Sequence, residues 1–483
     1  MDEIKIGLDF GTHQTKICIK KTPDEGHGLP EFEFMKFSDL KGDSYFFIPS
    51  VIQINKDDTL SYGFIDPKNE KEQVDRPTLR KVRPLEILDP EEDAEDLYNK
   101  YSPNAGYDIN AVNAIRNMIS LRNSIERKRY DEEMEAANTE YEKAMEQFLH
   151  HRNVFRYFKQ ATFAEYPWEA KIDPKILCVW YLAYIIFLLE ERFDEGFSIN
   201  LGVPTDDKTF LLKSHLGVQV LRSAYYLVEE VYQRDIDSFL NDKITSLVEK
   251  TKLFPYSDED KEDYEINIFP EAYASLIGLT SRGKLSPGMS INADIGGGTT
   301  DISFFVVHDG IPKIYKYWSI PCGLNYIAER SGFDYSEGDF MHEAHQDIID
   351  KFNKKKEDLV YNLVQELIVL LRKWNTGIDK SSLSRALKDR ILVYNGGGSS
   401  YPSIATPIFY FSDVKTVNSS LWTDEIMQDK EKVMKLASLL TTSFGLSVSE
   451  DDSDVVLCDF NSLFKEHSRD NSNEKEEIDK DVC

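Results

Sequence analysis

The chain has 483 residues, of which 41% are hydrophobic, and this length allows about two to four packed subdomains. Its formal net charge of -28 at pH 7 excludes nucleic acid and anionic membranes as general partners, because both would repel an acidic body. Five scattered cysteines argue against a disulfide framework and against a cysteine-rich zinc site, and we expect a cytoplasmic protein.

The first predicted element is a hairpin near the start of the chain. An apolar strand, residues 4–8, ends in Asp9, and a short glycine turn leads to an alternating second strand, residues 16–20. A hairpin of the same build begins far downstream with the sequence INADIGGGTTDI from residue 291. Laid over IGLDFGTHQTKI from residue 6 without a gap, it matches at Asp9/Asp294, Gly11/Gly296, Thr15/Thr300 and Ile17/Ile302. Two such hairpins predict two similarly built lobes.

The segments between and after the hairpins alternate between helical and strand patterns. Helical patterns cover residues 174–192, 207–233, 271–279 and 357–374, and strand patterns cover residues 197–203, 264–269, 391–394 and 406–411. The most apolar stretch, residues 176–189, is shorter than the roughly 20 residues that a bilayer-spanning helix needs, so we expect no membrane span. The alternation predicts an α/β sheet in each lobe.

Residues 67–170 are predicted to be an insertion in the first lobe, and they contain a charged helical pattern at residues 122–158. A solvated helical hairpin is the favoured interpretation of this pattern, and a partner-binding arm is the alternative. The other boundaries place lobe I at residues 1–280, lobe II at 281–430, a returning helix at 431–447, and an acidic tail, expected to be disordered, at 448–483.

The two hairpins carry the residue types that a triphosphate with magnesium requires. Glycine-rich turns bring several backbone N–H groups close to phosphate, and Mg²⁺ is commonly held through water by nearby carboxylates. The second hairpin offers Asp294 for the magnesium shell, Gly296, Gly297 and Gly298 as a phosphate cradle, and the hydroxyls of Thr299 and Thr300. The first hairpin offers a similar set from the opposite side: Asp9, Gly11, Thr12, Gln14 and Thr15. A protonated His13 in that turn would be able to contact phosphate, although a solvated side chain is the preferred interpretation.

A third glycine cluster directly follows the strand that ends at residue 394. It consists of Gly396, Gly397, Gly398 and Ser399, and the Tyr401-Pro402 pair after it can open a helix. A strand, a glycine bend and a helix N-terminus together form a place where a ribose or a flat ring can approach the backbone.

The order of these three clusters resembles the phosphate-1, phosphate-2 and adenosine motifs of the actin/DnaK-type ATPase superfamily. The string DIGGGTTDI from residue 294 is close to the family's characteristic sequence. Four shorter strings agree with it: FIPSV from residue 47, LGVP from 201, FPEAYA from 269 and PCGL, with Gly323, from 321. The resemblance covers roughly residues 1–66 and 171–446. It implies a duplicated actin-like ATPase fold, with two lobes around a cleft that binds ATP or ADP with Mg²⁺.

The sequence departs from the family pattern at two places. The family has a catalytic Glu at the position of Phe269, and Glu271 is the candidate to replace it in orienting magnesium or water. The family's catalytic Lys would fall near Lys81, where a surface basic cluster is an equally good interpretation. By the same resemblance, Arg372 and Lys373 at the end of a long helix are candidates to flank adenine.

The resemblance implies an ATP-hydrolysing, nucleotide-dependent conformational switch that acts on a partner protein. The chain ends before the place of a β-sandwich peptide-binding domain, so we do not expect that domain. A filament-forming actin-like protein and a nucleotide-binding scaffold without turnover are the alternatives, and a sugar or acetate kinase of the same superfamily is a weaker one. Nucleotide-dependent pelleting would favour the filament, and phosphate release no faster than in an Asp294→Ala variant would favour the scaffold.

Overall fold

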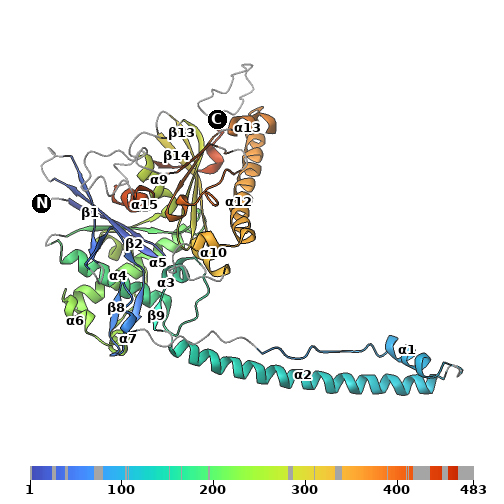
Figure 1. Cartoon of the computed structure of the whole chain (residues 1–483). Coiled ribbons are helices and arrows are strands. Elements are labelled where there is room, and N and C mark those ends of the chain that lie inside the picture. Colours follow the sequence, from blue (N-terminus) through green and yellow to red (C-terminus); the bar gives the residue numbers. More distant parts are fainter. Residues whose placement is uncertain are drawn as a thin grey trace. The chain divides into compact units, whose positions relative to one another are not determined.

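The structure is a computed structural model. It describes residues 3–23, 29–38, 42–69, 80–103, 106, 108–151, 153–164, 166–193, 196–280, 285, 287–308, 311–331, 340–388, 390–408, 411, 413–416, 436–448 and 455–465. These residues form a mixed α/β protein that divides into two compact units (Figure 1). The larger unit comprises Met1–Glu70, Val154–Trp168 and Ile172–Cys483, and the smaller comprises Lys71–Asn153 and Glu169–Lys171.

Two large sheets organise the larger unit. The first sheet has the strand order β11-β10-β1-β2-β3, with β6 also paired to β2. Its strands are β1 (Glu3–Phe10), β2 (Gln14–Thr22), β3 (Glu31–Phe34), β6 (Ile48–Pro49), β10 (Ser198–Val203) and β11 (Ile266–Pro270). The second sheet has the order β16-β15-β12-β13-β14-β17. Its strands are β12 (Gly288–Ile295), β13 (Thr300–His308), β14 (Ile311–Ile320), β15 (Ile391–Asn395), β16 (Asp413–Thr416) and β17 (Val456–Leu457).

The two sheets repeat one topology. In each, an antiparallel hairpin, β1–β2 or β12–β13, carries a third antiparallel strand on one side and two parallel strands on the other. The register also repeats, because Asp9 pairs with Lys16 in the first hairpin and Asp294 pairs with Asp301 in the second. The four hairpin strands are buried along most of their length, which explains their nearly continuous apolar sequences.

Helices cover the sheets and fill the space between them. The helices of the larger unit are α3 (Phe158–Phe163), α4 (Pro174–Glu190), α5 (Phe210–Tyr225), α6 (Ile236–Leu240), α7 (Ile244–Lys250), α8 (Asp258–Asp263), α9 (Glu271–Thr280), α10 (Leu324–Arg330), α11 (Phe340–Glu343), α12 (Gln346–Lys373), α13 (Lys380–Leu387) and α15 (Ala437–Ser447). Two small sheets complete this unit, β4 (Phe37–Ser38) with β5 (Ser44–Tyr45), and β8 (Leu60–Tyr62) with β7 (Ile52–Ile54) and β9 (Val154–Phe155). Among the residues that the structure describes, no helix is both long and apolar enough to cross a membrane.

Helices α9 and α15 share one hydrophobic core with strands from both sheets. This core includes Leu276 of α9, Phe444 of α15, Cys18 of the first sheet and Phe305 of the second. The two helices cross so closely that a Cβ at Gly445 would lie 1.8 Å from the carbonyl oxygen of Ala274. A Cβ at Gly278 would likewise lie 2.3 Å from the carbonyl oxygen of Thr441, so glycine is required on both helices at the crossing.

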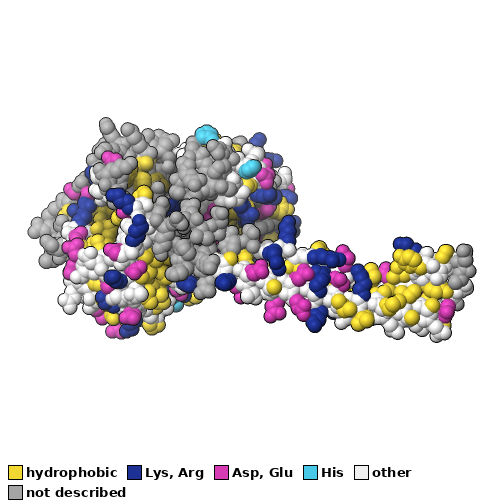
Figure 2. Space-filling view, turned by 60° about the horizontal axis from the view of Figure 1, so that its bottom comes forward, with side chains coloured by type: hydrophobic (Ala, Val, Ile, Leu, Met, Phe, Trp, Pro, Cys, Tyr) yellow, Lys and Arg dark blue, Asp and Glu magenta, His cyan; other side chains and the backbone are white. Residues whose placement is uncertain are grey.

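The smaller unit consists mainly of a single long helix. Helix α2 (Ile109–His151) packs against α1 (Glu92–Tyr101) through a cluster that includes Ala94, Tyr98, Val112 and Ile119. The predicted insertion is thus mainly the long helix α2, with α1 and the segment before it packed along one part of α2. On another face of α2, Met118, Leu121 and Ile125 are each at least 60% exposed. Figure 2 shows hydrophobic side chains gathered over this part of the unit.

Part of the C-terminal segment that we expected to be disordered is ordered. Strand β17 pairs in parallel with β14, and Leu463 and Phe464 are buried in the core of the second sheet. Apolar residues within an acidic segment explain this packing, whereas residues 466–483 lie outside the described ones. The predicted strand at 406–411 contains an isolated bridge between Ile408 and Phe411, and β16 lies further on. Of the predicted returning helix, residues 437–447 form α15 and residues 431–435 are not described.

Candidate functional site

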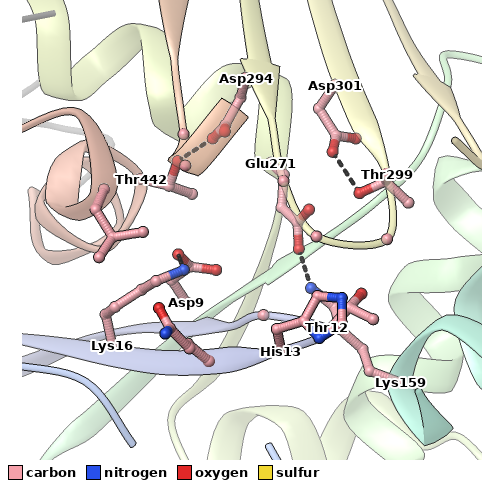
Figure 3. Close-up of a pocket in the computed structure, with 18 residues that line it drawn as sticks. Asp9, Thr12, His13, Lys16, Lys159, Glu271, Asp294, Thr299, Asp301 and Thr442 are labelled. Carbon is pink, nitrogen blue, oxygen red and sulfur yellow. Dashed lines mark hydrogen bonds and ion pairs between the residues drawn. The ribbon is translucent and has the colours of Figure 1, made fainter. Parts of the chain in front are cut away.

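The turns of the two hairpins line one cavity of about 60 Å³ (Figure 3). From the first hairpin it is lined by Asp9, Gly11, Thr12, His13, Gln14 and Lys16. From the second hairpin it is lined by Asp294, Gly296, Gly297, Gly298, Thr299 and Asp301. Lys159, Glu271, Gly396, Gly397, Leu439 and Thr442 complete it. The two aspartates that end the equivalent strands β1 and β12 thus lie at the same cavity.

The first turn is held by its own hairpin and by a serine from the next segment. The N–H of Gly11 donates to the carbonyl of Asp9 at 3.0 Å, and the Ser50 hydroxyl donates to the carbonyl of Gly11 at 2.6 Å. Thr15, a predicted ligand, instead lies 3.0 Å from the Ser50 hydroxyl and is not among the described lining residues. Lys16 forms an ion pair with Asp9 at 2.9 Å, with both side chains nearly buried.

The carbonyl groups of the second turn all point at donors outside the cavity. The Gly296 carbonyl accepts from the N–H of Leu324 at 3.0 Å, and the Gly297 carbonyl accepts from the N–H of Asn325 at 2.8 Å. The Gly298 carbonyl accepts from the Gln160 side chain at 2.8 Å. In a trans peptide the N–H points opposite to the preceding carbonyl. The N–H groups of residues 297, 298 and 299 are therefore turned toward the cavity, which is the arrangement of an anion-binding nest.

Glycine is required in this turn because the first hairpin packs directly against it. A Cβ at Gly297 would lie 1.7 Å from the His13 ring, and one at Gly298 would lie 2.4 Å from the Thr12 hydroxyl. Gly323, a predicted ligand residue, lies behind the turn, where its Cβ would be 2.5 Å from the Gly297 carbonyl. Its function in the structure is to let α10 approach the turn, and the predicted ligand Thr300 also faces away, donating to the Cys322 carbonyl at 2.7 Å.

Two carboxyl groups from the second sheet hold their protons unusually strongly. Burial, with Asp9 and Glu271 nearby, raises the pKa of Asp294 to about 7, although a 2.6 Å hydrogen bond from Thr442 opposes this shift. Burial and the neighbouring Glu271 also raise the pKa of Asp301 well above its usual range. The Thr299 hydroxyl donates to Asp301 at 2.9 Å. When Asp294 and Asp301 hold their protons, Asp9 and Glu271 are balanced by Lys16 and Lys159, and a cation bound at this cavity would favour the charged forms of Asp294 and Asp301.

Lys159 supplies a cation that the sequence reasoning missed. It lies in α3, is 3% exposed and forms an ion pair with Glu271. Burial alone would lower its pKa, but Glu271 and Asp9 outweigh burial and raise it, so the side chain stays charged. The predicted insertion at residues 67–170 includes this residue, and no glycine motif stands near it in the sequence. The pairing of Glu271 with a buried lysine supports the expected position of Glu271 at the site.

The third glycine cluster contributes Gly396 and Gly397 to the cavity. Gly396 has φ of 74°, and a Cβ there would lie 2.2 Å from Oδ1 of Asp294, so only glycine fits beside that carboxyl group. Gly398 and Ser399 are not among the described residues that line the cavity, and Ser399 donates back to the Gly396 carbonyl at 2.8 Å. Gly398 and Ser399 thus shape the bend that follows β15.

Three other predicted site residues are not among the described residues that line the cavity. Lys81 is an exposed residue of the smaller unit, and it is not among the described residues at the cavity. Arg372 and Lys373 are exposed at the end of α12, where Lys373 contacts the Asn461 side chain at 3.3 Å. Neither reaches the cavity as described. The structure thus gives no support to Arg372 and Lys373, and it brings Lys16, Asp301, Leu439 and Thr442 to the cavity in addition to Lys159.

The donor set suits a divalent cation held mainly through water or phosphate oxygens. Among the described residues, no group of three or more His, Cys, Asp or Glu side chains is placed to hold a metal ion directly. Mg²⁺ is usually bound through one or two carboxylates together with phosphate oxygens and several waters. Asp9 and Asp294 fit this mode. No protein-family model and no curated protein matches the chain.

Proposed function

We propose that the chain is an ATP-binding, actin-like protein of the DnaK type, with the two sheets as its duplicated lobes and the cavity as the phosphate end of its nucleotide cleft. One observation carries the proposal. Equivalent turns of two sheets with the same topology face each other, and each contributes an aspartate to one cavity. This is the arrangement that a phosphate chain with Mg²⁺ requires, since N–H donors, cations and carboxylates then surround it from both sides.

Particular residues would hold each part of the nucleotide. The N–H groups of residues 297, 298 and 299, with Lys16 and Lys159, would bind phosphate oxygens. Asp9 and Asp294 would hold Mg²⁺ through water, and the bend at Gly396 and Gly397 would be adjacent to the adenosine. Bound Mg²⁺ would supply positive charge for a phosphoryl group under attack by water.

The position of the cavity between the two hairpin turns favours a switch. A volume of about 60 Å³ accommodates a phosphate group or a few waters, as the phosphate end of a longer cleft would. A nucleotide held by both turns would bridge the two sheets, and the nucleotide state would set their separation. A partner protein that distinguishes the two arrangements would be controlled in this way.

A nucleotide-binding scaffold without turnover is the second candidate. Its support is the ion pair of Glu271 with Lys159, because a carboxylate already engaged by a buried cation is a weak base toward water. In the ATPase interpretation, Glu271 orients the attacking water and Lys159 neutralises charge that develops on the phosphate. Turnover decides between the two.

The proposal is tested by isothermal titration of the full chain with ATP, ADP and GTP, with and without Mg²⁺, together with a phosphate-release assay. We expect Mg²⁺-dependent ATP binding that is lost in Asp294→Ala and kept in Asp347→Ala, a control at an exposed position on α12. ATP binding that is unchanged in Asp294→Ala would show that the cavity is not the nucleotide site. Binding without phosphate release above that of Asp294→Ala would favour the scaffold.

A further inference from the structure

The carbonyl of Gly298 differs from its two neighbours in the kind of donor that holds it. Backbone N–H groups at the start of α10 hold the carbonyls of Gly296 and Gly297. The Gly298 carbonyl is instead held by a side chain, the Nε2 group of Gln160 in α3, at 2.8 Å. The orientation of the peptide between residues 298 and 299 therefore depends on one glutamine, and so does the direction of the Thr299 N–H.

Gln160 is itself fixed by a second buried amide. The Nδ2 group of Asn325 donates to Oε1 of Gln160 at 2.8 Å, and the two side chains are 2% and 3% exposed, respectively. A carbonyl can only accept, so Gln160 must present its NH₂ group to Gly298, and its oxygen is left to accept from Asn325. The hydrogen bonds from Asn325 through Gln160 to Gly298 thus all run in one direction, with each group donating to the next.

These hydrogen bonds join α3 and α10 to the second turn. Asn325 also holds the Gly297 carbonyl through its own backbone N–H at 2.8 Å, so α10 contacts the turn at two successive residues. The residue before Gln160 is Lys159, which pairs with Glu271 of α9 at the cavity. Two successive residues of α3 therefore fix the Glu271 carboxylate and the peptide that carries the Thr299 N–H.

We infer that Gln160, supported by Asn325, is a positioning residue that aims the Thr299 N–H at a bound phosphoryl group. The inference rests on the proposed function. Without the Gln160 donor, the peptide at residues 298–299 would be free to rotate, and an anion would lose one of three converging N–H groups. The effect falls on the phosphate part of the ligand and not on the nucleoside.

The test measures ATP and adenosine affinity of the full chain by isothermal titration for the wild type, Gln160→Leu, Asn325→Leu and Gln53→Leu. Gln53 is the matched control, because it is also fully buried and bonds the backbone of Asp66 through both ends of its amide, at 3.1 and 2.8 Å. We expect Gln160→Leu to weaken ATP about tenfold, the loss of roughly one anion hydrogen bond, with adenosine affinity unchanged. Asn325→Leu should show a smaller loss of the same kind, and Gln53→Leu should lower thermal stability only.

The outcomes separate the inference from the function beneath it. ATP binding by the wild type that is equally strong in Gln160→Leu would overturn the inference and leave the proposed function standing. Equal weakening of ATP and adenosine in Gln160→Leu would also overturn it, because a merely structural defect acts on the whole ligand. A wild-type chain that binds no ATP would overturn both. Amide NMR shifts of residues 297–299 that change in Gln160→Leu but not in Gln53→Leu would support the positioning contact directly.

Discussion

The two glycine hairpins share topology and register but differ in charge at one equivalent position. In the first, the residue paired with Asp9 is Lys16, and the two form an ion pair at 2.9 Å. In the second, the residue paired with Asp294 is Asp301. The first hairpin is therefore neutralised within itself, whereas the second collects two carboxyl groups.

This difference shows how a duplicated backbone can serve two functions at one site. The second hairpin depends on other elements for compensation: Thr442 of α15 bonds Asp294, and Lys159 of α3 is the nearby buried cation. The effects of pH and of added cations on the stability of the protein should consequently arise mainly at the second hairpin. Four predictions follow this contrast, in order of decreasing effect.

Removing the cation that α3 supplies should have the largest effect. Lys159→Met leaves Glu271 buried without its partner, and we expect a loss of about 3–5 kcal/mol in the free energy of unfolding. Urea unfolding measures it. Lys354→Met, which breaks an exposed pair with Asp358, is the control and should leave the unfolding curve unchanged. Equal stability of Lys159→Met and the wild type would show that Glu271 does not depend on this cation.

The second prediction concerns pH. The pKa of Asp294 is raised from 3.8 to about 7 in the folded chain, so the folded state binds more protons than the unfolded state between these values. The contribution of this group to stability then falls by about 2–4 kcal/mol as pH rises from about 4 to 7, and it levels off above. Urea unfolding of the wild type and Asp294→Asn at pH 5 and pH 8 isolates the contribution as a difference. An identical pH dependence in both proteins would contradict the elevated pKa.

The third prediction tests the contact between the turns. Gly297→Ala places a Cβ 1.7 Å from the His13 ring, whereas a Cβ at Gly296 meets only the Thr299 carbonyl, at 3.2 Å. We expect Gly297→Ala to cost about 1–3 kcal/mol of stability through overpacking, and Gly296→Ala to cost clearly less. Thermal unfolding compares the pair. If both variants unfold at the same temperature, the two turns are not in contact as described.

The smallest effect should come from the bond between α15 and the second hairpin. Thr442→Val removes the hydroxyl that donates to Asp294 at 2.6 Å, and this hydrogen bond lowers the pKa of that carboxyl group. The pKa of Asp294 should therefore rise further in the variant, as a ¹³C NMR titration of the carboxyl group can measure. A pKa that stays the same or falls would mean that the hydroxyl does not donate to this carboxylate in solution.

The sequence predicted the parts of the site that lie within one hairpin and missed those brought by distant segments. Asp9, Asp294 and the glycine turns follow from the internal repeat, because strand ends and turns are local features. Lys16 could also have been predicted. The gapless overlay aligns it with Asp301, each of these residues pairs with the aspartate of its own hairpin, and cross-strand partners share a face. Lys159 was not, because only folding brings it to Glu271, 112 residues away along the chain. A charged helical pattern also cannot show where an insertion ends. The predicted insertion therefore extends to residue 170 and includes Lys159, which belongs to the larger unit.

The crossing of α9 and α15 has a mechanical consequence. At Gly278 and Gly445 the main chains of the two helices meet with no side chain between them. A small twist about such a point disturbs few interlocking side chains, whereas the same twist at the periphery of the core would force many of them into new rotamers. If the two sheets move relative to each other as proposed, the crossing would be the point about which they turn with least repacking, and a methyl group added there would resist that turn.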